Sequence, residues 1–215
     1  MKAFEGDRVA MASLTMKLRS IGLSDARLLG AFETVPRRLF APARFHEDAY
    51  LDRAVPIECG QTLSAPSTVA LGLQALGAGA GQAVLEIGCG SGYQAAILAR
   101  IGARVTTLDR YRTLVDLASD RFATLKLTVE ALAADGFEGF ARRAPFDRII
   151  VDGAVTRVPP ALMDQLADKG VLVAPVGDGQ TQTLVRITRD GRLFNRTEMG
   201  TVRFVPLVEG LASRL

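Results

Sequence analysis

Three glycines at alternating positions mark the part of this sequence whose residue types most clearly suggest chemistry. The run Val84-Leu85-Glu86-Ile87-Gly88-Cys89-Gly90-Ser91-Gly92-Tyr93 predicts a buried strand, a Gly-x-Gly-x-Gly turn and the start of a helix. Glycine accepts positive φ and has no Cβ, so this turn lets a nucleotide-like ligand approach the backbone at a helix N-terminus. The spacing departs from the dinucleotide pattern G-x-G-x-x-G, because Tyr93 stands three residues after Gly90.

Two acidic residues near this turn narrow the kind of ligand. Glu86 lies two residues before the first glycine, and Asp109 follows the next predicted strand. Glycines combined with a strand-end acid suit a nucleoside with free ribose hydroxyls, and S-adenosylmethionine is the leading candidate. A short motif leaves two interpretations open: a methyltransferase, which the spacing favours, and a nicotinamide-dependent dehydrogenase.

The composition is that of one globular unit. The chain has 215 residues, 48% of them hydrophobic and 23% charged, which suits one α/β domain with an appendage. The net charge of +3 comes without a dense Lys/Arg stripe, so nucleic acid is not favoured as a partner, and the Arg37-Arg38 and Arg142-Arg143 doublets are expected to be solvated surface charge. Residues 1–8 hold no apolar run, and no stretch reaches the ~18 apolar residues of a membrane span. We expect a cytoplasmic protein.

The rarity of histidine and cysteine excludes several catalytic classes. His46 is the single histidine, so a Ser-His-Asp catalytic triad or a Cys-His catalytic dyad would have to use it. Cys59 and Cys89 lack CxxC spacing, which predicts neither a zinc site nor a disulfide framework. We expect no metal, a solvent-facing loop for His46, and a small, unreactive filler role for Cys89.

From residue 81 onward, strand-like and amphipathic segments alternate. Predicted strands cover 83–87, 104–108, 127–133, 146–151, 170–176, 182–188 and 201–208, and predicted helices cover 93–101, 111–122 and 159–167. The alternation predicts an α/β fold with a parallel sheet that helices cover on both faces. Ligands bind beyond the carboxyl ends of such strands, so the residues that follow those ends should meet in one crevice. These residues are 88–92, Asp109, Asp135 and Asp152.

The first 80 residues have a different character. Predicted helices at 7–20, 24–32 and 68–76 flank a proline-rich, loop-like segment, and Ser24 is the expected N-cap of the second helix. This segment is too short and too broken to form its own core. We expect residues 1–80 to be a helical and loop cap that carries substrate contacts, and residues 81–215 to be the cofactor-binding domain, the two forming one compact unit.

A second run, Gly60-Gln61-Thr62-Leu63-Ser64-Ala65-Pro66, is more specific than the glycine turn. Together the two motifs resemble the protein-L-isoaspartate O-methyltransferase family, and the likeness extends along nearly the whole chain through 35–40, 144–151, 170–177 and 203–207. The resemblance implies a seven-stranded, Rossmann-like methyltransferase domain that uses S-adenosylmethionine and releases S-adenosylhomocysteine. It also implies an acceptor, the free carboxylate of L-isoaspartyl residues in damaged proteins or peptides, and thus a role in protein repair.

The resemblance also implies roles for individual residues. Those assigned to the cofactor are Glu86, Gly88, Gly90, Ser91, Gly92, Asp109, Asp135 and Gly136, with Asp109 on the ribose hydroxyls and Asp135-Gly136 near the adenine. Thr62 and Ser64 would hold the substrate carboxylate beside the transferred methyl group. Each assignment has a local alternative: Thr62 and Ser64 could cap the following helix, Asp135 could serve a plain turn, and Glu86 could pin the glycine turn through backbone amides.

The expected reaction suits a chain with one histidine. A carboxyl group has a pKa near ~4, so at neutral pH the acceptor is already an anionic nucleophile. The sulfonium leaves as a neutral thioether, and neither step needs a general acid or base. Alignment of the reacting atoms, which can supply on the order of 7–11 kcal/mol, would then be the enzyme's main task.

Two departures from the family pattern leave the acceptor open. Ser67 stands where a larger, ring-bearing residue is usual, and Asp152 stands where the family is usually small and neutral. Asp152 could contact substrate or face the loop before Pro159. One alternative is therefore the same fold redirected to a modified peptide, a small acid or RNA. Another is a non-catalytic S-adenosylmethionine sensor, although the intact Gln61-Thr62-Leu63-Ser64 run argues against it.

Overall fold

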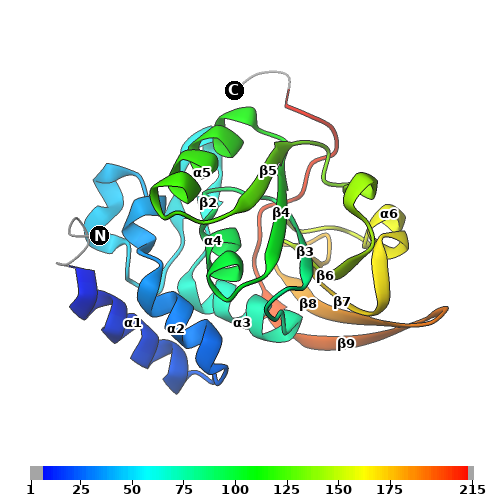
Figure 1. Ribbon diagram of the computed structural model, residues 1–215, viewed down its shortest axis with the longest axis horizontal. Coiled ribbons are helices and arrows are strands. Elements are labelled where there is room, and N and C mark those ends of the chain that lie inside the picture. The colour runs from blue at the N-terminus through cyan, green and yellow to red at the C-terminus, as the bar shows by residue number, and fades with distance from the viewer. Residues whose placement is uncertain (1–6, 213–215) are drawn as a thin grey trace.

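Seven strands form one sheet at the centre of residues 7–212, the part of the chain that this computed structural model describes (Figure 1). Their order is β5-β4-β3-β6-β7-β8-β9, and the pairs from β5 to β7 are parallel. The strands are β3 (Ala83–Ile87), β4 (Arg104–Asp109), β5 (Val129–Ala133), β6 (Phe146–Val151), β7 (Leu166–Val176), β8 (Gln182–Asp190) and β9 (Leu193–Val202). The predicted seven-stranded α/β fold is confirmed.

The last two strands correct the expected sheet. β8 pairs antiparallel with β7, and β9 pairs antiparallel with β8. Residues 177–181 and 191–192, which join these strands, suffice only for hairpins, whereas a parallel pair needs a crossover of a dozen or more residues. The predicted strand at 201–208 is wrong: β9 ends at Val202 and is an exposed edge strand, which lacks the apolar signal of a core strand. The predicted helix at 159–167 is also shorter, since α6 (Pro160–Asp164) gives way to β7 at Leu166.

Helices cover the sheet on both faces, as predicted. On one face lie α3 (Pro66–Leu76), α4 (Tyr93–Arg100) and α5 (Arg112–Thr124), while α6 and irregular segments cover the other (Figure 1). Successive residues of β3 divide between these faces, since Val84 joins the cluster under α3 and α4 whereas Leu85 joins the cluster that contains Leu162 of α6. The sheet is therefore buried on both sides at its centre.

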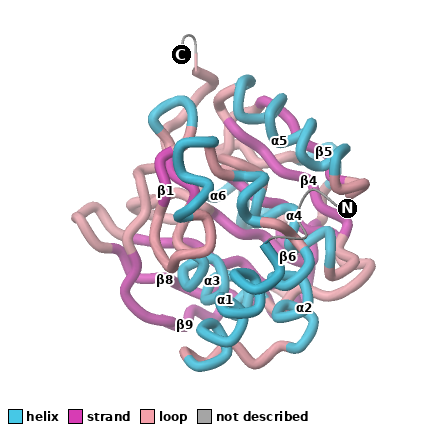
Figure 2. Tube along the Cα trace, turned by 90° about the vertical axis from the view of Figure 1, so that its left-hand side faces the viewer, coloured by secondary structure: helices cyan, strands magenta, loops and turns pink. Residues whose placement is uncertain are grey.

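The N-terminal segment packs on the helical face of the sheet. It contains α1 (Arg8–Ser20), α2 (Ala26–Thr34), three short 3-10 helices (Arg37–Phe40, Ala43–Asp48 and Glu58–Gly60) and a ribbon of β1 (Val55–Pro56) with β2 (Thr62–Leu63). In Figure 1 and Figure 2, α1 and α2 lie beside α3. One hydrophobic cluster joins Leu18 and Phe32 of this segment to Val173 of β7. The functional division at residue 80 stays a prediction.

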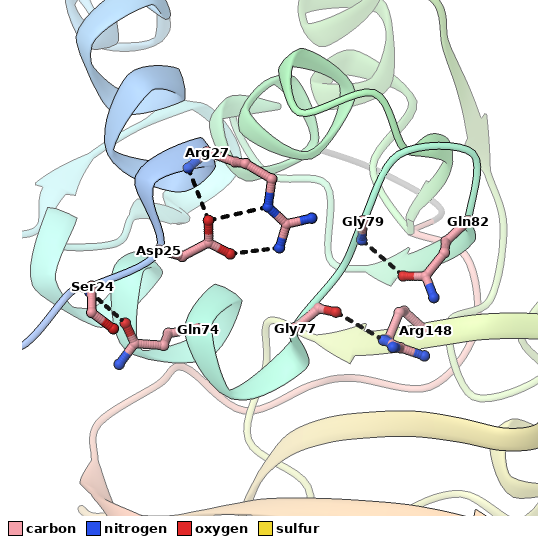
Figure 3. Close-up of polar contacts among 8 residues, drawn as sticks. All are labelled: Ser24, Asp25, Arg27, Gln74, Gly77, Gly79, Gln82 and Arg148. Atoms are coloured by element: carbon pink, nitrogen blue, oxygen red, sulfur yellow. Dashed lines mark hydrogen bonds and ion pairs between the residues drawn. The ribbon is translucent and has the colours of Figure 1, made fainter.

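Side-chain contacts join the N-terminal helices to α3. Asp25, rather than Ser24, caps α2: its Oδ1 accepts a hydrogen bond from the backbone N–H of Arg27 at 2.8 Å (Figure 3). The backbone N–H of Ser24 instead donates to Oε1 of Gln74 on α3, at 2.9 Å. The predicted cap is one residue early: the side chain of Asp25 caps α2, and Ser24 contacts α3 through its backbone N–H.

Two further features concern the lengths of the helices and the state of the cysteines. Within residues 7–212, no helix has the length and apolar character needed to cross a bilayer. Cys59 and Cys89 are both free thiols. Residues 1–6, which belong to the N-terminal stretch without an apolar run, lie outside the described residues, as do 213–215.

Candidate active site

A crevice opens where β3, β4 and β6 end side by side. The backbone N–H groups of Gly88 and Cys89 both donate to the carbonyl of Leu108 in β4, at 2.8 and 2.9 Å. On the other side of β3, the N–H of Asp152 donates to the carbonyl of Ile87 at 2.7 Å. The strand order reverses at β3, which is where open α/β sheets bind ligands. The predicted convergence of these strand ends is thus observed.

The glycines of the turn have two distinct uses. Gly88, Gly90 and Gly92 all have positive φ, of 92°, 52° and 86°. A Cβ on Gly92 would lie 2.8 Å from Cζ of Phe122, so this glycine lets α5 pack closely. A Cβ on Gly90 would meet nothing closer than Cδ1 of Ile57 at 3.8 Å. Gly90 therefore leaves room for a ligand, whereas Gly92 serves the fold.

Asp109 links the glycine turn to the crevice. Its Oδ2 accepts from the N–H of Gly90 at 2.8 Å, and its Oδ1 accepts from the N–H of Tyr111 at 3.0 Å. The side chain lines the crevice on both sides of the turn and is 8% exposed. Burial raises the pKa of this carboxyl group, and the backbone amides oppose that effect. Each oxygen keeps a lone pair that could accept a ribose hydroxyl.

Glu86 lies beneath the glycine turn rather than in the crevice. It is fully buried, its Oε1 accepts from Nε2 of Gln94 at 3.2 Å, and its Oε2 accepts from Oγ1 of Thr107. None of these partners is a backbone amide of the turn. Burial and the neighbouring Asp152 raise the pKa of Glu86 well above its ordinary value. The structure gives Glu86 no surface for contact with a cofactor.

Asp135 and Gly136 are neighbours in the sequence but have different surroundings in the structure. Both carboxylate oxygens of Asp135 accept from backbone amides, Oδ1 from Phe137 at 2.9 Å and Oδ2 from Gly210 at 2.8 Å. This agrees with the turn alternative for Asp135. Gly136 does line the crevice, and a Cβ there would lie 2.4 Å from Cγ2 of Ile87. Of the two residues, Gly136 is the one that lines the crevice.

Ser91 and Cys89 complete the glycine turn. Ser91 Oγ accepts from the backbone N–H of Tyr93 at 3.3 Å, and its carbonyl accepts from Nη1 of Arg121 at 2.9 Å. Cys89 is 5% exposed, and burial raises the pKa of its thiol well above the ordinary value. A thiol in this state is a poor nucleophile, which fits the expected filler role.

Thr62 and Ser64 face a cleft that adjoins the glycine turn. The wider, outer part of this cleft has a volume of about 590 Å³ and is lined by Thr62, Ser64 and Asp152 among others. The alternative in which the two hydroxyls cap α3 is wrong, because α3 has no side-chain cap at its N-cap position. Oδ1 of Asp52 instead accepts from the N–H of Ser67, at 2.9 Å. Among the described residues, Ser64 Oγ has no hydrogen-bond partner.

Arg37 is a part of the site that the sequence interpretation missed. Its side chain is fully buried, which contradicts the expected solvated surface charge. Nη2 donates to the carbonyl of Ser64 at 2.7 Å, and the guanidinium carbon lies 5.1 Å from the centre of the Tyr93 ring. Burial lowers its pKa to about 10. An Arg-Arg doublet carries no local signal that distinguishes a buried arginine from a solvated one.

The C-terminal segment forms a wall of the crevice that was also missed. Val205 and Leu207 pair with Ala154, through N–H···O contacts of 2.8 Å each, and both line the crevice. A Cβ on Gly153 would lie 3.0 Å from Cβ of Leu207, so this close approach requires glycine. The sequence predicts a strand at 201–208 because alternation alone cannot distinguish a strand from an extended covering segment.

The single histidine takes no part in the crevice. Nε2 of His46 lies 3.2 Å from the carbonyl of Ala41, and the residue is half-buried in a 3-10 helix rather than in the expected exposed loop. Within residues 7–212, no group of three or more His, Cys, Asp or Glu side chains is arranged to hold a metal ion.

The fold and crevice are those of an S-adenosylmethionine-dependent methyltransferase. A family model described as protein-L-isoaspartate(D-aspartate) O-methyltransferase matches residues 10–212, and the chain belongs to this family. It is 48% identical to a protein-L-isoaspartate O-methyltransferase of Maricaulis maris over 206 residues, which cover 95% of this chain and 97% of that relative.

Two solved structures are also similar to the chain. A protein-L-isoaspartate O-methyltransferase structure superposes with a TM-score of 0.84 at 25% identity, covering 94% of this chain and 67% of the other. A protein from Plasmodium falciparum described as belonging to the same enzyme class, in complex with S-adenosyl-L-homocysteine, gives 0.79 at 26% identity and covers 91% and 97%. The predicted family, enzyme class and S-adenosylmethionine-dependent reaction are confirmed.

Proposed function

We propose that this crevice transfers a methyl group from S-adenosylmethionine to the free carboxylate of L-isoaspartyl residues, with Ser64 and Thr62 holding that carboxylate. The observation that carries these two roles is the unused hydroxyl of Ser64 in the cleft. Asp52 already caps α3, so the hydroxyl has no structural task in the described chain. A free hydroxyl beside the glycine turn is well suited to donate a hydrogen bond to an acceptor anion.

The crevice residues fit the proposed cofactor. Gly88, Gly90, Ser91 and Gly92 would follow its methionine end, Asp109 would accept its ribose hydroxyls, and Gly136 would face its adenine. When bound, the cofactor supplies an electrophilic methyl group on a sulfonium. The space above Gly90, with no side chain nearer than 3.8 Å to an added Cβ, supports a ligand at this turn.

The contribution of the chain to the reaction is alignment and exclusion of water. The acceptor is already ionised at neutral pH, so no residue needs to remove a proton from it. Ser64 and Thr62 would orient the acceptor oxygen, while Val205 and Leu207 cover the crevice from the other side. Holding reactants in line can supply on the order of 7–11 kcal/mol.

The outer cleft supports a peptide as the acceptor. Its volume of about 590 Å³ and its position next to Ser64 leave room for the residues on either side of an isoaspartate. Ser67 lies in a neighbouring hollow that shares Thr68 and Arg203 with this cleft. The small side chain of Ser67, in place of the usual larger residue, therefore widens this hollow rather than the acceptor site itself. The free thiols of Cys59 and Cys89 support a reducing, cytoplasmic location.

A pair of peptides tests the acceptor directly. Methyl transfer from labelled S-adenosylmethionine is measured with two peptides identical except that one contains L-isoaspartate and the other aspartate. We expect labelling of the isoaspartyl peptide alone. Calorimetric binding of S-adenosylmethionine with no labelling of either peptide would contradict the proposal and favour a redirected acceptor or a sensor.

A further inference from the structure

Asp152 is the acidic residue in the crevice that the proposed reaction does not use. Asp152 lines the crevice beside Gly88 and Asp109, the inner part of the cleft beside Ser64, and the outer part of that cleft. It packs directly on the glycine turn: a Cβ on Gly88 would lie 3.3 Å from the carbonyl oxygen of Asp152 and 3.4 Å from its Cβ. Asp152 is therefore positioned against the part of the turn that faces the methionine end of a cofactor.

The hydrogen bonds of Asp152 leave half of its carboxylate free. Nε2 of Gln94, on α4, donates both to Oδ2 of Asp152 and to Oε1 of Glu86. One amide thus bridges two carboxyl groups. In the described part of the chain, no protein group donates a hydrogen bond to Oδ1 of Asp152. This oxygen is also not fully enclosed by other atoms. The free oxygen is open to the crevice.

The charges around Asp152 are unbalanced. Glu86 from β3 and Asp109 from the end of β4 are acidic, and Gln94 is neutral. Arg110 and Arg203 line parts of the same crevice, but neither forms an ion pair with Asp152, and no described residue does so. A cluster of acids without a cation is costly to ionise in a partly buried site. A bound cation would relieve that cost.

We propose that Asp152 is the counter-ion for the positive charge at the methionine end of S-adenosylmethionine. The ligand offers two such charges, the ammonium and the sulfonium, and either can pair with a carboxylate. The isoaspartyl acceptor is itself an anion, so the carboxylate of Asp152 would repel it. The cationic cofactor is therefore favoured over the acceptor as the partner of Asp152. This role of Asp152 rests on the proposed function, whose cofactor is the ligand that Asp152 would recognise.

Proton linkage is a consequence that needs no substitution to measure. Burial raises the pKa of Asp152 to about 7, so near neutral pH the free protein holds this group partly protonated. A cation beside the carboxylate favours its ionised form, and cofactor binding should release a fraction of a proton to the buffer. Calorimetry at pH 7 in two buffers with different ionisation enthalpies measures that release. Binding without proton release between pH 6 and 8 would contradict the proposal.

The substitution Asp152→Asn tests the residue itself, since it keeps the shape of the side chain and the contact with Gln94. We expect S-adenosylmethionine to bind about 10- to 100-fold more weakly at pH 8, the range for a lost charge-assisted hydrogen bond. S-adenosylhomocysteine distinguishes the two cations: an equal loss assigns the ammonium, and a loss confined to S-adenosylmethionine assigns the sulfonium. The matched control Asp164→Asn, an exposed acid on α6, should bind both as the wild type does.

The outcomes separate this inference from the proposed function. Wild-type affinity for both ligands in Asp152→Asn, with a changed KM for the isoaspartyl peptide, would overturn the inference and place Asp152 on the acceptor. Failure of the wild-type protein to bind S-adenosylmethionine at all would instead remove the proposed function.

Discussion

Nη2 of Arg37 donates to the backbone carbonyl of Ser64 across 2.7 Å. This bond joins the first 3-10 helix of the N-terminal segment to the loop between β2 and α3. The same guanidinium lies over the ring of Tyr93, the residue with which α4 begins after the glycine turn. Arg37 therefore contacts both the loop that would hold the acceptor and the helix that follows the cofactor turn. Its Nε and Nη1 are buried without partners among the described residues, so the contact to Ser64 is one of few that it makes.

Arg37→Ala should destabilise the protein through a cavity beside Tyr93 and an unpaired carbonyl at Ser64. We expect the free energy of unfolding to fall by about 2–4 kcal/mol, measured by urea denaturation. Arg37→Met restores much of the packing volume, so it should recover much of the stability while still raising KM for the isoaspartyl peptide. Arg19→Ala, at an exposed position of α1, is the control. Wild-type stability in Arg37→Ala would contradict the structural role.

Ser64→Ala should lower kcat/KM for an isoaspartyl peptide by about 10- to 100-fold, because a hydrogen bond to a charged group contributes about 1.5–3 kcal/mol. The free energy of unfolding should stay within about 0.5 kcal/mol of wild type, since the hydroxyl has no partner within residues 7–212. Ser24→Ala, exposed and outside the crevice lining, should leave both quantities unchanged. An unaltered kcat/KM in Ser64→Ala would remove Ser64 from the site.

Gly90 and Gly92 offer a matched pair of substitutions. Gly92→Ala places a methyl group 2.8 Å from Phe122 at a φ of +86°, and we expect a loss of about 2–4 kcal/mol in unfolding free energy. Gly90→Ala adds only the cost of a left-handed residue, about 1–2 kcal/mol, since 3.8 Å of space remains. Its larger effect should be on cofactor affinity, measured by calorimetry. Equal stability losses would contradict the assignment of separate uses.

The stability of the ligand-free protein should decrease as pH rises toward and past neutrality. Burial raises the pKa of Asp152 from 3.8 to about 7, so between these values the folded state binds more protons than the unfolded chain. The free energy of unfolding then falls as pH rises through this window. Asp152→Asn removes the titrating group, and at pH 8 it should exceed wild-type stability by about 2–4 kcal/mol, since a tenfold change in proton affinity is worth about 1.4 kcal/mol.

Urea denaturation at pH 5, 6, 7 and 8 checks this prediction, with Asp164→Asn as the control for loss of a surface acid. The difference between Asp152→Asn and wild type should grow with pH. A constant difference across the series would show that Asp152 has an ordinary pKa in the folded protein.

Local pattern was sufficient for the central part of the fold. The run that becomes β3, the glycine turn and α4 was predicted nearly to the residue, because buried strands and glycine turns are specified by short-range sterics and apolar content. The convergence of Asp109 and Asp152 also followed from sequence, since parallel strands bring their carboxyl ends to one edge. The position of β9 did not, because an exposed edge strand carries little apolar signal.

The family motifs, the alternation of strands and helices and the residue types available at the crevice follow directly from the amino-acid sequence, because they depend on local composition and spacing. Which residues of a given type are buried, paired or free depends instead on how the whole chain packs. Arg37 is buried while Arg38 remains partly exposed, and Glu86 is hidden while Asp109 lines the crevice. Such differences arise from contacts between residues far apart in the chain, as between Arg37 and Ser64, and no local pattern encodes them.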